Sequence, residues 1–350
     1  MRNARRRWGV ALAAALLALP AGCSRDPGPV QLDGPAMGTT YSVSLPHLPG
    51  GTDRDAVEAV IADVLREADE QLSGWNDRSE LVRFNNSPST DWQPVSPVLL
   101  ESVEQAQAVS RATNGTFDIT VGPLVRAWGF GARANAGPSV PAPEALAQLR
   151  AHVGYEKLEL RPSPPALRKS TPGLEIDLDG IAPGWAVDRI AARFESLGIR
   201  DYLVELGGEV RARGMNAEGR RWRVAVETPR AGERQAYAVI ELDGVGVSTS
   251  GDYRDYREVA GRRISHTIDP RSGAPVGHGL ASVTVVRESV AEADAWATAL
   301  MVLGPEEGMA LARRERLAAL FIRHGEQPGT FVAEETPEFA RLRVPPGARL

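Results

Sequence analysis

The chain has 350 residues, with 45 Asp and Glu against 40 Lys and Arg and a formal net charge of −5 at pH 7. This acidic balance, without a basic tract, argues against nucleic-acid binding. A single cysteine excludes an internal disulfide and leaves no His/Cys cluster with zinc spacing. The length allows one large domain or two closely joined ones with an ample apolar core.

The N-terminus has the three parts of an export signal. Arginines at positions 2, 5, 6 and 7 precede an apolar run over residues 8–19, and Ala21-Gly22-Cys23 then resembles the bacterial lipobox. The run is too short for a permanent transmembrane helix. We therefore expect residues 1–22 to be a cleaved signal peptide and Cys23 to carry acyl chains such as palmitate. Ordinary secretion, with Cys23 removed or left as a free thiol, is the alternative.

Cleavage of the signal peptide would change the net charge of the chain, and the new charge indicates how the chain would be held at a membrane. The remaining chain has 36 Lys and Arg against 45 Asp and Glu, a net charge of −9. Such a chain would not adhere electrostatically to anionic lipid, so the acyl chains would be the membrane anchor. Residues 23–30 are typical of a flexible tether, and residues 31–350 would form the globular domain. We expect a lipoprotein of the bacterial cell envelope that faces the periplasm, at the inner membrane.

Strand and helix patterns alternate through the globular part. Period-two patterns predict strands over residues 39–45, near Leu158, and over 174–178, 202–206, 221–226, 236–242, 246–250 and 281–286. Helical spacing predicts helices over 55–72, 97–109, 143–152 and 184–197, one from about Ala291 and another from Glu306. Loops are expected over 129–143 and 162–172. The mixture favours an α+β fold with mixed or antiparallel sheets and packed helices over a doubly wound sheet.

A strand-to-helix junction carries the first candidate site. Asp177 and Asp179 precede Gly180, and Pro183 stands in the first turn of the following helix. Backbone N–H groups at a helix start attract phosphate, and Asp177 can accept hydrogen bonds from the sugar or base of a ligand. A simple helix cap with acids near its positive end explains the same pattern.

A second candidate site lies at the start of the last long helix. Asp294 and Thr298 are four residues apart, so they share a helical face and could offer two oxygens to one hard cation such as Mg²⁺. The alternative is an acid at a helix start and a threonine that bonds to its own helix.

The third candidate site combines hydroxyl groups with a histidine. Residues 248–250 are Ser-Thr-Ser before Gly251, and such hydroxyls can line a phosphate or a flavin ring. His266 is a candidate acid or base, although a lone histidine beside the strong turn Asp269-Pro-Arg-Ser-Gly273 is more often structural. The sequence has no Gly-x-Ser-x-Gly elbow, Walker loop or Gly-x-Gly-x-x-Gly motif, so hydrolase, P-loop and Rossmann classes are not supported.

In this order, the segments resemble the ApbE family of FAD:protein FMN transferases. The likeness covers about residues 31–320 and includes four further motifs: Met37-Gly-Thr-Thr-Tyr41, the segment 73–85, the segment 115–125 and Trp128-Gly-Phe130. It implies an α+β fold of two intimately joined lobes, with FAD in the cleft between them.

The resemblance also implies the ligands of individual residues. Mg²⁺ would be held by Asp294, Thr298 and the Gly180 carbonyl. Pro183 stands in the predicted FAD site where many members have lysine, and Trp75 stands where tyrosine is common. The full predicted FAD-binding set is Met37, Trp75, Thr116, Phe117, Asp118, Asp177, Pro183, Thr249, Ser250 and Ile268.

The implied reaction moves FMN from FAD to a Thr or Ser hydroxyl of an acceptor flavoprotein and releases AMP. Acceptors would be flavin-carrying subunits of membrane redox pumps or periplasmic FMN-binding proteins. The attack needs a base within hydrogen-bond reach, for which His266, Asp252 and Asp269 are candidates. Two alternatives stay open: a metal-dependent FAD pyrophosphatase and a non-catalytic FAD-binding lipoprotein. Retention of both Asp294 and Thr298 argues against storage alone.

Overall fold

A computed structural model describes residues 28–132, 140–230, 232, 235–253, 256–259, 262–327 and 329–345. The predicted signal peptide, Cys23 and most of the predicted tether lie outside these residues, as does part of the loop expected over 129–143. Within the described part of the chain, no helix is long and apolar enough to cross a membrane.

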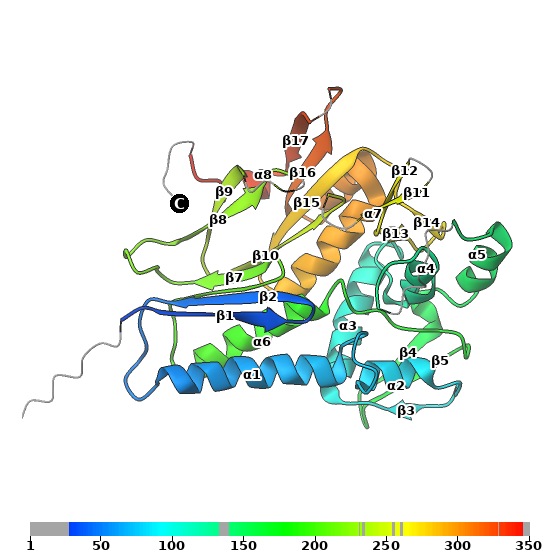
Figure 1. Ribbon diagram of the computed structural model, residues 1–350, viewed down its shortest axis with the longest axis horizontal. Helices are drawn as coiled ribbons and strands as arrows, with labels where there is room; N and C mark the ends of the chain where they lie inside the picture. Colours follow the sequence, from blue (N-terminus) through cyan, green and yellow to red (C-terminus); the bar gives the residue numbers. More distant parts are fainter. Residues whose placement is uncertain are drawn as a thin grey trace, which may run out of the picture.

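An eight-stranded sheet forms the centre of the molecule (Figure 1). Its spatial order is β1-β2-β6-β7-β10-β15-β16-β17, and every neighbouring pair is antiparallel. The strands are β1 (Val30–Ala36), β2 (Thr39–Leu45), β6 (Tyr202–Leu206), β7 (Glu209–Arg213), β10 (Val245–Gly251), β15 (Leu280–Arg287), β16 (Ala318–His324) and β17 (Phe331–Glu335).

Three helices cover one face of this sheet: α1 (Arg54–Gln71), α6 (Ala182–Ser196) and α7 (Val290–Arg314). They bury the largest apolar cluster of the described residues against the strands. Helix α1 begins at Asp53, whose carboxylate accepts a hydrogen bond from the Ala56 amide at 2.9 Å. Helix α7 is kinked at Gly304 (φ 82°), directly before Pro305. Two helices therefore meet at this kink, as the sequence predicted.

The opposite face of the sheet is covered by a β-hairpin and a short helix. The hairpin consists of β8 (Trp222–Glu227) and β9 (Ala236–Leu242), and the helix is α8 (Pro337–Ala340). These elements bury a second apolar cluster against the sheet. Figure 1 shows α1 and α6 on one side of the sheet and the β8–β9 hairpin on the other.

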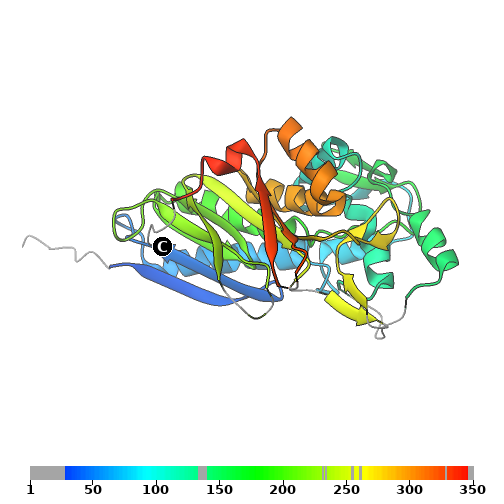
Figure 2. The ribbon, with the colours of Figure 1, turned by 90° about the horizontal axis from the view of Figure 1, so that it is seen from above.

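A second lobe packs beside the sheet, joined to it where α3 contacts α7. In Figure 2 its β11–β12 ribbon, in yellow, projects at the edge of this lobe. The elements of the lobe are α2 (Glu80–Asn86), β3 (Gln93–Pro94), α3 (Pro97–Ala112), η1 (Ile119–Val121), α4 (Gly122–Ala127), α5 (Pro143–Arg150), η2 (Tyr155–Lys157), β4 (Leu158–Arg161), β5 (Ala166–Lys169), β11 (Tyr256–Val259), β12 (Arg262–Ser265), β13 (Ile268–Asp269) and β14 (Ala274–Pro275).

The α+β class predicted from the sequence is confirmed, but two element predictions were wrong. The segment 174–178 belongs to no strand. The Asn85 side chain satisfies its backbone instead, with hydrogen bonds of 2.7 Å to the Ile176 carbonyl and 2.8 Å from the Ile176 amide. The loop expected over 162–172 contains β5, which is paired on both sides by β3 and β4. Val30, the last residue of the expected tether, already begins β1.

Candidate active site

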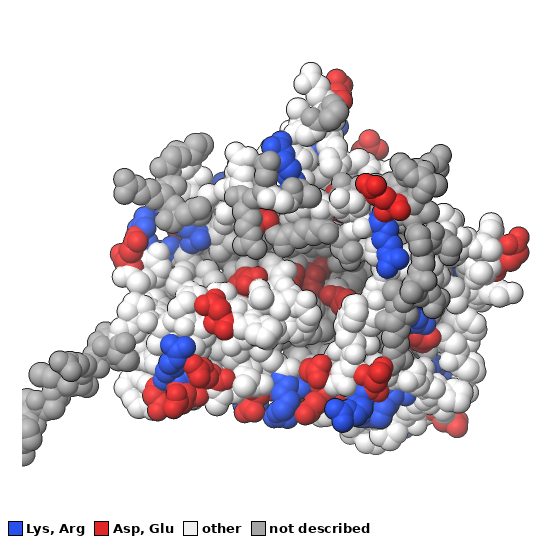
Figure 3. Space-filling model, viewed as in Figure 1, with Lys and Arg blue, Asp and Glu red and all other residues white. Residues whose placement is uncertain are grey.

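A cleft of about 1280 Å³ lies between the central sheet and the second lobe. Residues from both parts of the molecule line it. Drug-sized ligands occupy pockets of about 300–1,000 Å³, so this cleft has room for a dinucleotide and part of a second molecule. Figure 3 shows the hollow near the centre of the face drawn, with acidic side chains inside it.

Most of the predicted site residues line this cleft. Met37, Pro183, Asp252 and Asp269 do not belong to the lining. Met37 lies in the turn between β1 and β2 with φ 48°, and Pro183 lies in the first turn of α6. The lining residues among the predictions are Trp75, Thr116, Phe117, Asp118, Asp177, Gly180, Thr249, Ser250, His266, Ile268, Asp294 and Thr298.

Of the three candidate bases, His266 is the one that lines the cleft. The Asp269 carboxylate instead accepts hydrogen bonds from the amide and guanidinium of Arg271 at 2.9 to 3.0 Å, which closes the predicted turn. Asp252 lies 3.4 Å from the His324 ring. The ring of His266 packs edge-to-face on Phe130, with centroids 6.3 Å apart. His266 is therefore positioned to reach a cleft ligand.

The segment before α6 brings two carboxylates to the cleft. The Asp179 amide donates to Asp177 at 2.9 Å, and the Asp177 amide donates to the Ile119 carbonyl at 2.6 Å. Burial, followed by the Asp177 charge, raises the pKa of Asp179 to about 7, while a hydrogen bond from Trp75 lowers it. Burial also raises the pKa of Asp177. Asp179, which belongs to the first candidate site but had no ligand role predicted for it, lines the cleft beside Asp177.

Trp75 and Thr116 have groups available to a ligand. Trp75 is 65% exposed at the edge of the cleft, so its ring face can stack on a planar ligand. The Thr116 hydroxyl is buried and has no hydrogen-bond partner among the described residues. The Asp118 carboxylate, in contrast, is occupied by the Thr120 amide and hydroxyl and by the Tyr155 amide, at 2.7 to 2.8 Å. Asp118 therefore shapes the loop, while Thr116 can bind.

Helix α7 places Asp294 and Thr298 in the cleft one turn apart, as their spacing predicts. Asp294 is 6% exposed, and its Oδ1 lies 3.4 Å from the Ser248 hydroxyl. Its buried Oδ2 has no partner among the described residues. The Thr298 hydroxyl lies 3.2 Å from that of Ser250. A Cβ added to Gly180 would lie 3.4 Å from the Thr298 hydroxyl, so the Gly180 backbone lies beside that hydroxyl.

The electrostatics around Asp294 are unfavourable without a cation. Burial, then the charges of Glu209 and Asp179, raise the pKa of Asp294 well above its ordinary value. Ser248, one of the hydroxyls of the third candidate site, also donates to Glu209 at 3.2 Å, and strand alternation places it on the same face as Ser250. Glu209 was missed because no strand was predicted over β7. One carboxylate with neutral oxygens around it is a donor set that Mg²⁺ uses.

The charged residues of the described lining are all acidic: Asp33, Asp118, Asp177, Asp179, Glu205, Glu227 and Asp294. Within the described residues, neither lysine nor arginine is part of this lining. A pyrophosphate bound here would be repelled unless a cation accompanied it.

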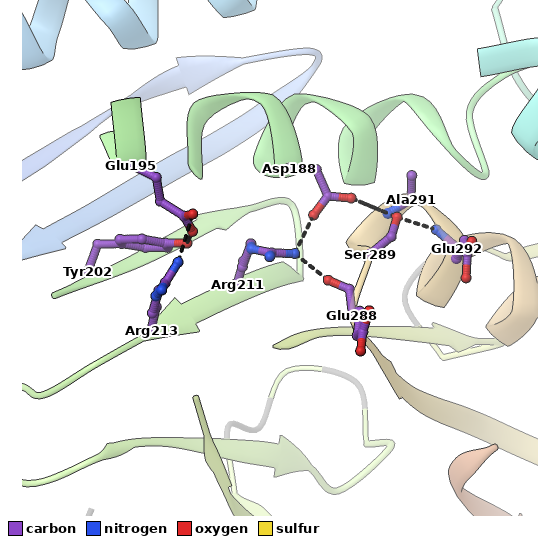
Figure 4. A network of polar contacts seen from close by, with 9 residues as sticks. All are labelled: Asp188, Glu195, Tyr202, Arg211, Arg213, Glu288, Ser289, Ala291 and Glu292. Atoms are coloured by element: carbon purple, nitrogen blue, oxygen red, sulfur yellow. Dashed lines mark hydrogen bonds and ion pairs between the residues drawn. The ribbon is translucent and has the colours of Figure 1, made fainter. Parts of the chain in front are cut away.

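A polar network holds the start of α7 in place (Figure 4). Asp188 of α6 accepts hydrogen bonds from the Ser289 hydroxyl at 2.8 Å and the Ala291 amide at 3.1 Å. Its other oxygen pairs with Arg211 of β7 at 2.9 Å, and Arg211 also donates to the Glu288 carbonyl. A Cβ on Gly184 would meet the Ala291 backbone at 2.7 Å, so glycine allows the close helix contact. This packing fixes the rotation of α7 that points Asp294 into the cleft.

The antiparallel α+β fold thus carries a large acidic cleft with the exposed Trp75 at its edge. A family model described as the ApbE family matches residues 37–321. The chain is 42% identical over 317 residues to an FAD:protein FMN transferase of Vibrio cholerae serotype O1, covering 91% of this chain and 93% of that protein. It is 39% identical over 340 residues to the FAD:protein FMN transferase of Escherichia coli K12, covering 94% and 95%.

A solved structure, the apo form of the Pseudomonas stutzeri flavinyl transferase ApbE, superimposes with a TM-score of 0.82. It is 40% identical, and the match covers 90% of this chain and 96% of that one. The chain belongs to the ApbE family, as its motifs predicted, and is a flavin transferase.

Proposed function

We propose that this enzyme transfers the FMN moiety of FAD to a Thr or Ser hydroxyl of an acceptor flavoprotein in a Mg²⁺-dependent reaction. The observation that carries the proposal is Asp294, a buried carboxylate in the FAD-sized cleft whose Oδ2 has no partner among the described residues. Binding of a flavin alone requires no such group, whereas chemistry at a pyrophosphate does.

Three oxygens would hold the cation: a carboxylate oxygen of Asp294, the Thr298 hydroxyl and the Gly180 carbonyl. Their surroundings fit this role, because the buried Oδ2 lacks a donor and the Gly180 backbone lies beside the Thr298 hydroxyl. A bound Mg²⁺ would neutralise the negative charge that develops on the phosphate oxygens. Ser248 and Ser250 would keep Asp294 and Thr298 oriented through their hydroxyl contacts.

In the proposed reaction, the acceptor oxygen forms a bond to the phosphorus next to riboflavin. The bond from that phosphorus to the bridging oxygen of the pyrophosphate breaks, and AMP leaves with the bridging oxygen. His266 would take the hydroxyl proton, since it is the candidate base that lines the cleft. Trp75 would orient the ligand by stacking, and the Thr116 hydroxyl by a hydrogen bond.

One experiment separates this function from its alternatives. The soluble form, beginning at Ser24, is incubated with FAD, Mg²⁺ and a candidate FMN-binding acceptor domain from a redox-pump subunit or a periplasmic flavoprotein. We expect the acceptor to gain the mass of one FMN with equimolar AMP, and EDTA to abolish the gain. Free FMN plus AMP with an unmodified acceptor would indicate a pyrophosphatase, and unchanged FAD would indicate a carrier.

We also propose that the enzyme works as a periplasm-facing lipoprotein of the inner membrane, anchored through Cys23. The lipobox-like Ala21-Gly22-Cys23 supports this location. An anchored enzyme on a short tether would have a raised local concentration near membrane-bound acceptors. A Cys23→Ser chain should leave the membrane fraction yet transfer FMN in solution at the unanchored rate, and loss of solution activity would contradict this division of roles.

A further inference from the structure

The central sheet has a notch where it borders the cleft. Strands β6 and β7 end at the turn Gly207-Gly208, with Leu206 paired to Glu209. Strand β7 pairs with β10 only at residues 245–247, whereas β10 continues along β15 as far as Gly251. Throughout the described part of the chain, no strand pairs with the second edge of residues 248–251.

The cleft passes around this open edge. The Ser250 hydroxyl faces α7, 3.2 Å from Thr298, whereas the Thr249 hydroxyl faces the other side of the sheet, 2.8 Å from Thr284. Successive side chains of a strand point to opposite faces, yet both residues line the same cleft. That is possible because the edge between the two faces is open.

The notch is wide enough for an additional strand. In the sheet order, β6 and β7 separate β10 from β2, whose residues Thr40, Tyr41 and Ser42 also line the cleft. With neighbouring strands spaced about 4.8 Å apart, the gap beyond the β6–β7 turn is about 14 Å wide. An unpaired edge inside a substrate cleft is a template for strand addition.

We propose that residues 248–251 of β10 bind the acceptor protein by strand addition, so that its Thr or Ser side chain faces α7. The proposal deepens the transfer function above and rests on it, because transfer requires a second substrate beside the phosphorus. An added strand puts every second side chain on the α7 face, where Asp294, Thr298 and Ser250 lie. The pairing register of the added strand then determines which acceptor hydroxyl lies in the site.

The face of the sheet turned away from α7 indicates the chemistry of the acceptor segment. Its wall is apolar, formed by Leu203, Val210, Val224, Val226 and Val247, all of which line the cleft. Acidic side chains accompany this wall at Glu205 and Glu227. The residues directly before and after the modified Thr or Ser point at this wall, so they are apolar, and acidic side chains there are disfavoured by like charge.

Hydrogen exchange tests the assignment of the edge. The soluble enzyme is loaded with FAD and Mg²⁺ and mixed with the acceptor domain modified in the transfer assay, in which the target Thr is replaced by Val. We expect exchange of the amides in residues 248–251 to slow by about tenfold or more with the acceptor and not with FAD alone. The peptide covering α1 serves as an internal control and should not change.

Each other outcome overturns a defined statement. Equal protection with FAD alone would assign the edge to the flavin substrate. Absence of protection, with an acceptor that is modified in the transfer assay, would show that the acceptor docks elsewhere. If wild-type enzyme modifies no acceptor domain at all, the transfer function and the strand proposal fall together.

Disulfide trapping tests the extended conformation. The chain has one cysteine, Cys23, so the soluble form beginning at Ser24 contains none. Val224→Cys then introduces a single thiol on the apolar wall, and Val332→Cys, on an exposed position of β17, is the matched control. Acceptor variants with one cysteine at each position within three residues of the target Thr should cross-link to Val224→Cys at odd offsets only. Cross-linking at helical spacing, or equally at every offset, would overturn an added strand.

Discussion

Two carboxylates near the start of helix α7, the half-buried Asp188 and the buried Asp294, have opposite surroundings. Asp188 receives hydrogen bonds on both oxygens, from Ser289, Ala291 and Arg211. Asp294 lies on α7, and its Oδ1 has one contact, of 3.4 Å, to the Ser248 hydroxyl. Within the described residues, its Oδ2 has no hydrogen-bond partner. Burial raises the pKa of both, but the surrounding donors and Arg211 oppose the shift at Asp188, whereas Glu209 and Asp179 add to it at Asp294.

The difference separates an anchor from a binding group. Asp188 stabilises the folded chain, because donors of the chain itself replace the water it loses on burial. Asp294 makes the folded chain less stable, because its charge is buried without that replacement. A residue that is unfavourable for stability and still faces the substrate cleft is typical of a functional site.

The largest expected effect follows from Asp294→Ala. Transfer of FMN should fall by about a thousandfold, since the cation contributes several kcal/mol at the transition state. Thermal unfolding without Mg²⁺ should occur at the same or a higher temperature, because a buried unpaired charge is removed. Asp294→Asn, which keeps the shape, is the control and should behave alike. A large loss of stability in either variant would show that Asp294 is an anchor too.

The next effect is that of Asp188→Ala, which should lower the free energy of unfolding by about 3 kcal/mol, since Arg211, Ser289 and the Ala291 amide all lose their charged acceptor. Urea unfolding measures this change. The apparent KM for Mg²⁺ in FMN transfer should rise as well, because the start of α7 is no longer fixed. Asp188→Asn retains an acceptor oxygen, so its free energy of unfolding should fall less and its apparent KM for Mg²⁺ should rise less. Wild-type stability in Asp188→Ala would contradict the role of the network.

Lys169 extends the comparison to a buried cation. Its ammonium is fully buried and donates to the carbonyls of Asn85 and Ser87 at 3.0 and 2.9 Å. Burial lowers the pKa of Lys169 from 10.5 to about 8, with the Glu175 charge opposing the shift. Between these two values the unfolded chain binds more protons than the folded one, so stability rises with pH in this window and is constant below it.

The test is urea unfolding of wild type and Lys169→Met at pH 7.5, 8.5 and 9.5. The contribution of Lys169 should make the wild type gain about 2 kcal/mol over this range relative to the variant. Parallel pH profiles of the two proteins would show that the ammonium is as well solvated in the fold as in water.

The smallest effect is expected at the far end of the anchoring network. The Tyr202 hydroxyl donates to Glu195 at 2.8 Å, and Glu195 also pairs with Arg213 at 2.7 Å. Tyr202→Phe removes one hydrogen bond and should lower the free energy of unfolding by about 1 kcal/mol. The rate of FMN transfer and the KM for Mg²⁺ should stay at wild-type values. A change in either would mean that coupling to the site extends beyond Asp188.

Local patterns determined a large part of this structure in advance. Alternation of apolar residues predicted β2 with its observed bounds, and helical spacing predicted α1, α3 and α6 to within a few residues. The four-residue spacing of Asp294 and Thr298 predicted that both face one way, which requires only a helix. Such features are properties of one segment, so a single sequence contains them.

Tertiary structure decided what those segments do together. Strand β5 and the unpaired segment 174–178 depend on partners far away in the chain, so periodicity alone misassigned both. Asp179 and Glu209 reach Asp294 only through packing of α6 and β7 against α7. The open edge of β10 exists because β6 and β7 end early in the sheet, and strand periodicity cannot show which neighbour is absent. The sequence thus determined the chemical groups and those elements whose pattern is local, whereas contacts between distant segments decided the remaining elements and which groups share a site.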